Sequence, residues 1–166
     1  IAEALKTRYA DKTDAYIAAF KKAYPVTAMP SDMLDLDVGM RPNALKFAGI
    51  KSSVEGGAPV YNYLFAWSAP HLDGMIKSMH CQEIAFVFNN IEFNEQYSGG
   101  TPEAYALSDK MSKTWVNFAQ TGDPNNGAIP QWDAFTKDNG ASMIFDNVSE
   151  LKNHHDKELI ELVTTR

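Results

Sequence analysis

Residues 59–67 read PVYNYLFAW and lie between the glycines at 56–57 and the turn residues SAP at 68–70. β-branched and aromatic residues fill this run, a composition typical of a β-strand. Its near-continuous apolar character predicts a strand covered on both faces, as in the sheet of an α/β fold. A second, shorter strand is expected at 143–145. Because one doubly covered strand does not make a stable sheet, we expect these strands to require neighbours that this chain does not contain.

Helical periodicity dominates the rest of the chain. Apolar residues recur at three- and four-residue steps in four segments, residues 1–24, 33–55, 102–120 and 153–163. Pro42 is expected to kink the second segment or to start a new helix there. The third segment has the clearest start, because Thr101 can cap it and Pro102 suits the first helical position. The chain is therefore predicted to be an α/β segment that is mostly helical, with two or three short strands.

Length, charge and cysteine content exclude several classes of protein. The 166 residues suit one domain or part of a larger one, and 45% hydrophobic with 22% charged residues is an ordinary globular composition. The net charge of −6 argues against a nucleic-acid-binding surface, which needs clustered Lys and Arg. No apolar run approaches the ~20 residues of a membrane span. The single Cys81 excludes an internal disulfide and a multi-cysteine zinc site.

Histidine supplies the candidate chemistry, because no zinc-binding pattern, P-loop or G-x-S-x-G motif is present. There are four histidines, His71, His80, His154 and His155. A lone histidine is more often structural than catalytic, and the pair at 154–155 is expected on the solvated face of the last helix. His80 has a different setting, because it follows the predicted strand after a loop and precedes the apolar run 84–88. Functional groups of open α/β sheets lie on such loops at strand ends.

Four segments carry a resemblance to one family. Residues 79–88 (MHCQEIAFVF) resemble the histidine motif of the type-B carboxylesterases, the cholinesterase-like branch of the α/β-hydrolases, in which glutamate stands three residues after the histidine. Residues 60–65 (VYNYLF) resemble the strand that precedes this motif. Residues 115–125 (WVNFAQTGDPN) and 129–135 (IPQWDAF) are similar to the two segments that follow it. The motifs occur in the family's order and together cover about residues 59–146.

The resemblance implies that residues 1–166 are the incomplete C-terminal segment of a single α/β-hydrolase domain. The family carries a serine in a G-x-S-x-G elbow, then an acid, then the histidine, in that chain order. This chain contains only the histidine of that set. We therefore expect the serine, the oxyanion-hole amides and the acid to precede Ile1 in a longer parent; the absence of an initial Met suits this expectation.

The activity implied by the resemblance is hydrolysis of small-molecule carboxylic esters by acyl transfer, with no metal and no organic cofactor. His80 is expected to act as general base toward the serine and then as general acid toward the leaving alcohol. Glu83 is expected to be a supporting carboxylate of the site and not the acid of the triad. Cys81 is not expected to be a nucleophile. The candidate substrate-pocket residues are Trp67, His71, Met75 and Met79.

Two alternatives stay open. Some relatives of these esterases are catalytically inactive adhesion or binding proteins, and the sequence upstream of Ile1 would distinguish them, because a G-x-S-x-G motif there indicates an esterase. The second alternative is that this chain has no independent activity, which is compatible with an active parent. The expected partners are the missing N-terminal portion of the same enzyme or, through the strand at 59–67, a second copy of the chain. Neither nucleic acid nor a membrane span is expected.

Overall fold

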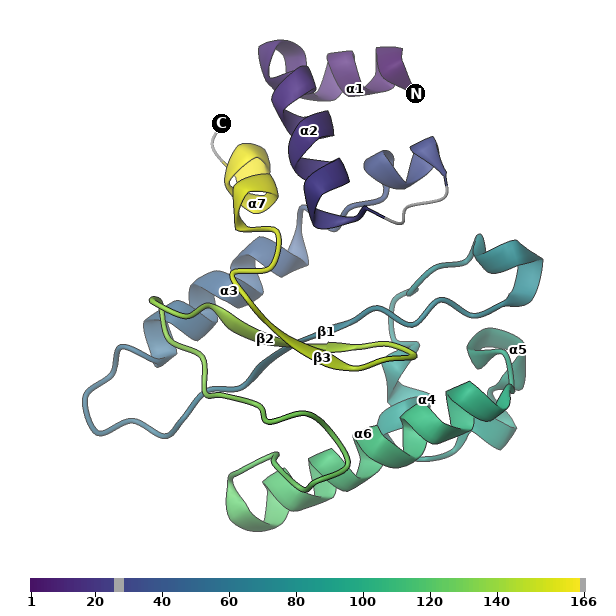
Figure 1. Cartoon of the computed structure of the whole chain (residues 1–166), viewed down its shortest axis with the longest axis vertical. Helices are drawn as coiled ribbons and strands as arrows, with labels where there is room; N and C mark the ends of the chain where they lie inside the picture. Colours follow the sequence, from purple (N-terminus) through teal and green to yellow (C-terminus); the bar gives the residue numbers. More distant parts are fainter. Residues whose placement is uncertain (26–28, 165–166) are drawn as a thin grey trace.

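A computed structural model describes residues 1–25 and 29–164 (Figure 1). Its helices are α1 (Ala2–Tyr9), α2 (Thr13–Ala23), α3 (Met40–Lys51), α4 (Glu83–Val87), α5 (Glu95–Ser98), α6 (Pro102–Thr121) and α7 (Lys157–Thr164). Its strands are β1 (Asn62–Phe65), β2 (Ala141–Phe145) and β3 (Glu150–Asn153). Four short 3₁₀ turns lie at Ala10–Lys12, Pro30–Leu34, His71–Gly74 and Ile91–Phe93. The prediction of an α/β chain that is mostly helical with two or three short strands is confirmed.

The sheet has the order β1-β2-β3 within the described residues. β1 pairs parallel with β2, so that Tyr63 faces Met143 and Phe65 faces Phe145, and β2 pairs antiparallel with β3. All five residues of β2 are buried, whereas β1 is only half-buried. The prediction that the first strand is covered on both faces is therefore wrong for the described chain, in which Tyr63 is 38% exposed and residues 61–65 line a cavity.

The predicted strand at 59–67 is also longer than the observed one. In the observed register, only residues 62–65 pair with β2, opposite residues 142–145. The Ala66 amide still donates to Phe145 O at 2.8 Å, and the chain then leaves the sheet. The expected strand at 143–145 is confirmed as part of β2. β3 was not predicted, and it occupies the first residues of the helix expected at 153–163, so that α7 begins only at Lys157.

Two other predicted helices are broken in the structure. The segment 1–24 divides at Ala10, whose φ is +49°, and the Thr13 hydroxyl donates to Ala10 O at 2.7 Å. In the segment 33–55, regular helix begins only at Met40, whose amide donates to Asp37 Oδ1 at 2.8 Å. Pro42 lies in the first turn of α3, where its missing N–H costs little, so the expectation of a new helix start there is confirmed.

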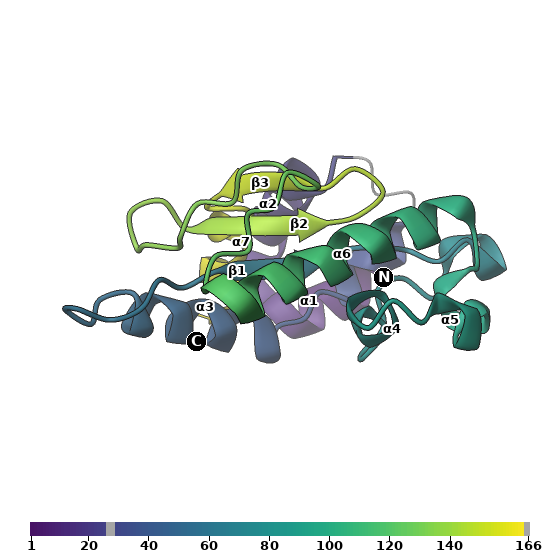
Figure 2. The ribbon, with the colours of Figure 1, turned by 90° about the horizontal axis from the view of Figure 1, so that it is seen from below.

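Helix α6 matches its prediction closely. The Thr101 hydroxyl accepts a hydrogen bond from the Ala104 amide at 3.3 Å and caps the start of the helix. Gly122, with φ of +78°, ends the helix, and its amide donates to Phe118 O at 2.8 Å. In Figure 2, α6 crosses the face of the sheet. Trp115 of α6 packs there against Phe145 of β2, with ring centroids 5.8 Å apart.

The buried residues form two cores. One lies between the sheet and helices α4 and α6, and it includes Phe86, Met111 and Phe145. The other joins α1, α2 and α7 through residues such as Tyr16 and Leu159. In Figure 1 these two groups of helices lie on opposite sides of the sheet region, with α1, α2 and α7 at the top and α4, α5 and α6 at the bottom.

The outer edge of β1 has no paired strand in the described part of the chain. A cavity of about 800 Å³ lies along this edge, between β1, helix α3 and the start of α7. Its walls include every residue from Tyr61 to Phe65, together with Glu83. This open, aromatic edge is consistent with the expectation that the strand requires a neighbour.

Candidate functional site

His80 lies in the turn between the loop that follows β1 and the start of α4. The loop leaves the carboxyl end of β1, which is the end of a parallel strand where functional groups of α/β proteins gather. The His80 side chain is exposed. Among residues 1–25 and 29–164, its imidazole has no hydrogen-bond or ion-pair partner, so both ring nitrogens are available to groups from outside the described chain.

Gln82 fixes the turn that carries His80. Its side chain is 3% exposed. Its Oε1 accepts a hydrogen bond from the Met79 amide at 3.2 Å, and its Nε2 donates to Tyr97 O at 2.6 Å. The residue before His80 is therefore tied to helix α5 through one buried amide group. Sequence analysis did not identify Gln82, although it stands at helical spacing before the buried Ala85 and Phe86, which is a signal of a core-facing position.

Trp67 anchors the other end of the same loop. Its indole Nε1 donates to Ser98 O at 2.9 Å, and its carbonyl accepts from the Ser78 hydroxyl at 2.8 Å. The ring is 5% exposed and packs with Phe86 in the main core. In this structure Trp67 is thus a core residue that holds the loop, and a contact with substrate stays a prediction.

The other candidate pocket residues lie in different environments. His71 is exposed, and its Nε2 is 3.1 Å from Glu95 O, so this ring is bound to the start of α5. Met75 is 63% exposed at the outer part of the loop. Met79 is half-buried and directly precedes His80. Of these three residues, only Met79 is next to His80, because it precedes His80 in the chain. None of the three lines the cavity at β1.

Glu83 is the first residue of α4 and is half-buried. It lines the cavity at β1. The pKa of the nearby Tyr63 is raised by burial and, secondarily, by the charge of Glu83. Within the described residues, no hydrogen bond joins Glu83 to His80. Glu83 thus lines the cavity at β1, and in the described residues it does not hold the imidazole of His80 by a hydrogen bond.

The histidine pair at the end of β3 is not on a solvated face, so that expectation is wrong. His154 Nε2 lies 2.6 Å from Asp138 O, and the ring packs against Gly140, leaving no room for a β-carbon there. His155 is half-buried and stands edge-on to Tyr24, with ring centroids 5.5 Å apart. Burial and, secondarily, the charge of Arg41 lower the pKa of His155 to about 4.

A buried ion pair next to this histidine joins three elements. Arg41 of α3 and Asp156, just before α7, approach to 2.7 Å, and both are largely buried. The Tyr24 hydroxyl, at the end of α2, accepts from Arg41 at 2.7 Å and donates to Asp156 at 2.8 Å. Burial raises the pKa of Tyr24 to about 12 and also raises the pKa of Asp156. These polar contacts connect the ends of helices, and Arg41 also lines the cavity at β1.

Two kinds of feature are absent from the residues that the structure describes. No group of three or more His, Cys, Asp or Glu side chains is placed to hold a metal ion there. Nor does that part of the chain contain a helix with the length and apolar character needed to cross a membrane.

Comparison with known proteins gives one consistent result. The family described as Carboxylesterase family matches residues 6–162. Carboxylesterase 5A of Felis catus is 39% identical over 90 residues, which are 50% of this chain and 16% of that protein. Para-nitrobenzyl esterase of Bacillus subtilis (strain 168) is 31% identical over 103 residues, which are 61% of this chain and 21% of that protein. The chain therefore spans about a fifth or less of these relatives.

Solved structures agree over a larger share of the chain. An esterase from anaerobic Clostridium hathewayi, which can hydrolyse aliphatic aromatic polyesters, superposes with a TM-score of 0.84 and 33% identity. That similarity covers 98% of this chain and 31% of the esterase. A thermophilic PNB esterase has a TM-score of 0.63 and 26% identity, over 98% of this chain and 32% of its own. The arrangement of helices and strands described above is thus part of an α/β-hydrolase fold.

Proposed function

Because the chain belongs to the carboxylesterase family, we propose that the intact protein hydrolyses carboxylic esters and that this chain supplies the histidine of its catalytic triad. The observation that carries the proposal is the position of His80. It is an exposed imidazole without a partner in the described residues, in an anchored turn that follows the carboxyl end of a parallel strand. The serine and the acid come from the remainder of the protein.

The proposed mechanism is acyl transfer with His80 as the proton carrier. The imidazole takes the proton of the serine hydroxyl while the serine oxygen bonds to the ester carbonyl carbon. The same proton passes to the leaving alcohol when the carbon–oxygen bond of the ester breaks. A water molecule then attacks the acyl-enzyme, with His80 again accepting and returning the proton. Imidazole suits both directions because its charge changes near neutral pH.

The remaining site residues have supporting roles in this proposal. Gln82 and Trp67 hold the two ends of the loop that presents His80. Glu83 contributes a carboxylate that lines the cavity at β1. Met79, Met75 and His71 border the ester substrate. No metal or organic cofactor takes part.

A binding or adhesion protein that has lost its catalytic serine is the alternative. The buried hydrogen bonds of Gln82 favour the enzyme, because a protein that only binds would not need to fix the turn of an otherwise unpartnered histidine. The upstream sequence distinguishes the two, since only the esterase requires a serine in a G-x-S-x-G elbow.

Activity assays test the proposal. The intact protein should hydrolyse p-nitrophenyl acetate with saturation kinetics and should be inactivated by an organophosphate that labels one serine. The isolated 166-residue chain should not exceed the rate of free imidazole, because it lacks the nucleophile and the oxyanion hole. An intact protein that binds the ester without turnover would favour the binding alternative, and saturable turnover by the isolated chain would contradict the assignment of the serine to the remainder.

A further inference from the structure

The sequence contains two Asn-Gly dipeptides, Asn126-Gly127 and Asn139-Gly140. In such a pair the glycine amide nitrogen can attack the asparagine side chain, because glycine has no β-carbon to obstruct the approach and gives the backbone wide freedom. From sequence alone the two sites are equivalent. Their surroundings in the structure are not.

At Asn139 the attacking group is held in place. The Gly140 amide donates to Thr136 O at 2.9 Å. Gly140 is buried, and a β-carbon built on it would lie 2.5 Å from the His154 ring, which shows how closely the backbone is packed. The Asn139 Oδ1 also accepts from the amides of Thr136 and Ala141, at 2.8 and 2.9 Å. Nucleophile and side chain are therefore both fixed.

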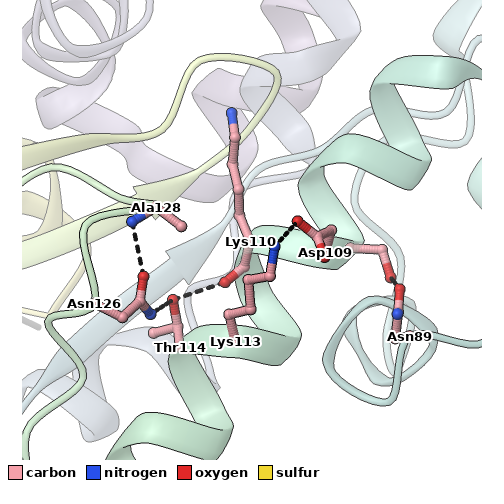
Figure 3. Close-up of polar contacts among 8 residues, drawn as sticks. Asn89, Asp109, Lys110, Lys113, Thr114, Asn126 and Ala128 are labelled. Carbon is pink, nitrogen blue, oxygen red and sulfur yellow. Dashed lines mark hydrogen bonds and ion pairs between the residues drawn. The ribbon is translucent and has the colours of Figure 1, made fainter.

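At Asn126 the attacking group is free. Gly127 is exposed, and nothing lies within 4 Å of a β-carbon built on it. In the part of the chain that the structure describes, its amide makes no hydrogen bond. The Asn126 Oδ1 accepts from the Ala128 amide at 2.8 Å (Figure 3). Since Asn139 Oδ1 accepts a matching hydrogen bond from the Ala141 amide, the two sites differ in the freedom of the glycine amide and not in this contact.

We propose that Asn126 is a site of spontaneous deamidation and that Thr114 restrains its rate. The Gly127 nitrogen bonds to Asn126 Cγ and loses its proton, the Cγ–Nδ2 bond breaks, and ammonia leaves with that proton. The product is a cyclic imide. Water then adds to the imide and breaks one of its two ring C–N bonds, which gives aspartate or isoaspartate at position 126. No group is oxidised or reduced, and the only co-reactant is water.

Thr114 restrains the reaction through the leaving group. Asn126 Nδ2 donates to the Thr114 hydroxyl oxygen at 3.0 Å and to Pro124 O at 3.2 Å. The Thr114 hydroxyl donates in turn to Lys110 O at 2.8 Å, so its lone pairs face Asn126 (Figure 3). Thr114 is 1% exposed within α6 and cannot turn away. Loss of this acceptor leaves the Asn126 side chain with only its bonds to Pro124 O and the Ala128 amide, which weakens the restraint on its rotation toward the Gly127 nitrogen.

The test is a comparison of the two sites in one molecule. The folded protein is incubated at mildly alkaline pH, and peptides containing residues 126 and 139 are followed by mass spectrometry and by an isoaspartate assay. Asn126 should convert several-fold faster than Asn139, and in denaturant the two rates should become similar. Equal rates in the folded protein, or an Asn126 that stays intact while the denatured chain converts, would overturn the proposal.

Two matched variants test the role of Thr114. Thr114→Val removes the hydroxyl at nearly constant volume and should speed conversion of Asn126 several-fold without changing Asn139. Thr114→Ser keeps the hydroxyl and should convert at the original rate. Melting curves recorded beforehand establish that each variant is folded. An unchanged rate in Thr114→Val would refute the restraint, and a rise at both sites would show general loosening instead.

Discussion

Gln82 is a positioning residue for His80. Its buried side-chain amide joins the backbone of Met79, directly before His80, to Tyr97 of helix α5. Gln82→Ala leaves the Met79 amide and the Tyr97 carbonyl without this partner, and we expect a loss of about 1–3 kcal/mol in the free energy of unfolding. If His80 is the proton carrier, the same change should lower kcat of the intact enzyme more than it raises KM. Denaturant unfolding and steady-state kinetics measure the two effects.

The matched control for this prediction is Gln120→Ala, an exposed glutamine near the end of α6. It should change neither stability nor kcat appreciably, because exposed side chains away from special features contribute little. A Gln82→Ala enzyme with lower stability and unchanged kcat would show that Gln82 supports the fold only.

At the scale of elements, we expect the turn between β3 and α7 to make the structure sensitive to acid. Burial holds the pKa of His155 at about 4 in the folded chain, below the ~6.5 of an unfolded histidine. The unfolded state therefore binds more protons between these values, and stability is lost as the pH falls through that window. Asp156, whose pKa is raised, opposes part of this loss. We expect the melting temperature to fall from pH ~6.5 toward ~4.

His155→Phe tests which group is responsible for that fall. A phenylalanine ring at this position can still pack beside Tyr24, but it cannot be protonated. The melting temperature should therefore depend less on pH across the same window. Val148→Ala serves as the control, because Val148 is 78% exposed and carries no titratable group, so its loss should leave the slope unchanged. An identical slope in His155→Phe would assign the acid sensitivity to other groups.

Elements with strong local signals were predictable from the sequence. Helix α6 has a side-chain cap, a proline at its first position and a glycine after its end, and its bounds agree within one residue. β3 has no such signal, since ELKN lacks alternating apolar residues and becomes a strand only by pairing with β2. The break at Ala10 also depends on tertiary contacts. Leu5 before the break and Tyr16 after it both pack in the second core, and helical periodicity alone does not predict this.

The site was predictable only in part, for a related reason. The motif around His80 is contiguous, so the sequence was sufficient to single out that histidine. Its supports come from distant segments: Gln82 reaches Tyr97, and Trp67 reaches Ser98. The half-buried positions of His154 and His155 likewise depend on Asp138 and Tyr24, far away in the chain. Local patterns carry no information about such contacts.

At the scale of the whole molecule, the outer edge of β1 is the place where a further strand could pair with the sheet. Its backbone is unpaired in the described chain, and aromatic side chains line the adjoining cavity of about 800 Å³. Open strand edges pair with other chains. We expect the isolated chain to self-associate through residues 59–67, to rearrange so that they are hidden, or to bind the remainder of the enzyme. Sedimentation at several concentrations and hydrogen exchange across this segment measure the outcome.

A charged residue on that edge tests whether the chain associates through it. Leu64 lines the cavity, and Leu64→Lys should weaken association, because a lysine on a strand edge disfavours pairing. Val148→Lys is the control, since Val148 is 78% exposed in the turn between β2 and β3. A dilute, rigid monomer in which the strand at 59–67 stays solvent-exposed and yet exchange-protected would contradict the expectation.

The central claim is that His80 is the histidine of a serine esterase, and one measurement tests it most directly. The kcat of the intact enzyme on p-nitrophenyl acetate is compared with that of His80→Ala, Glu83→Gln and His154→Ala, all verified as folded. Loss of His80 should lower kcat by on the order of 10⁴ or more, as for other triad members. Glu83→Gln should have a milder effect, and His154→Ala should change kcat little. A His80→Ala enzyme that keeps its activity would contradict the claim, and a Glu83→Gln loss as large as that of His80→Ala would assign Glu83 the role of the acid.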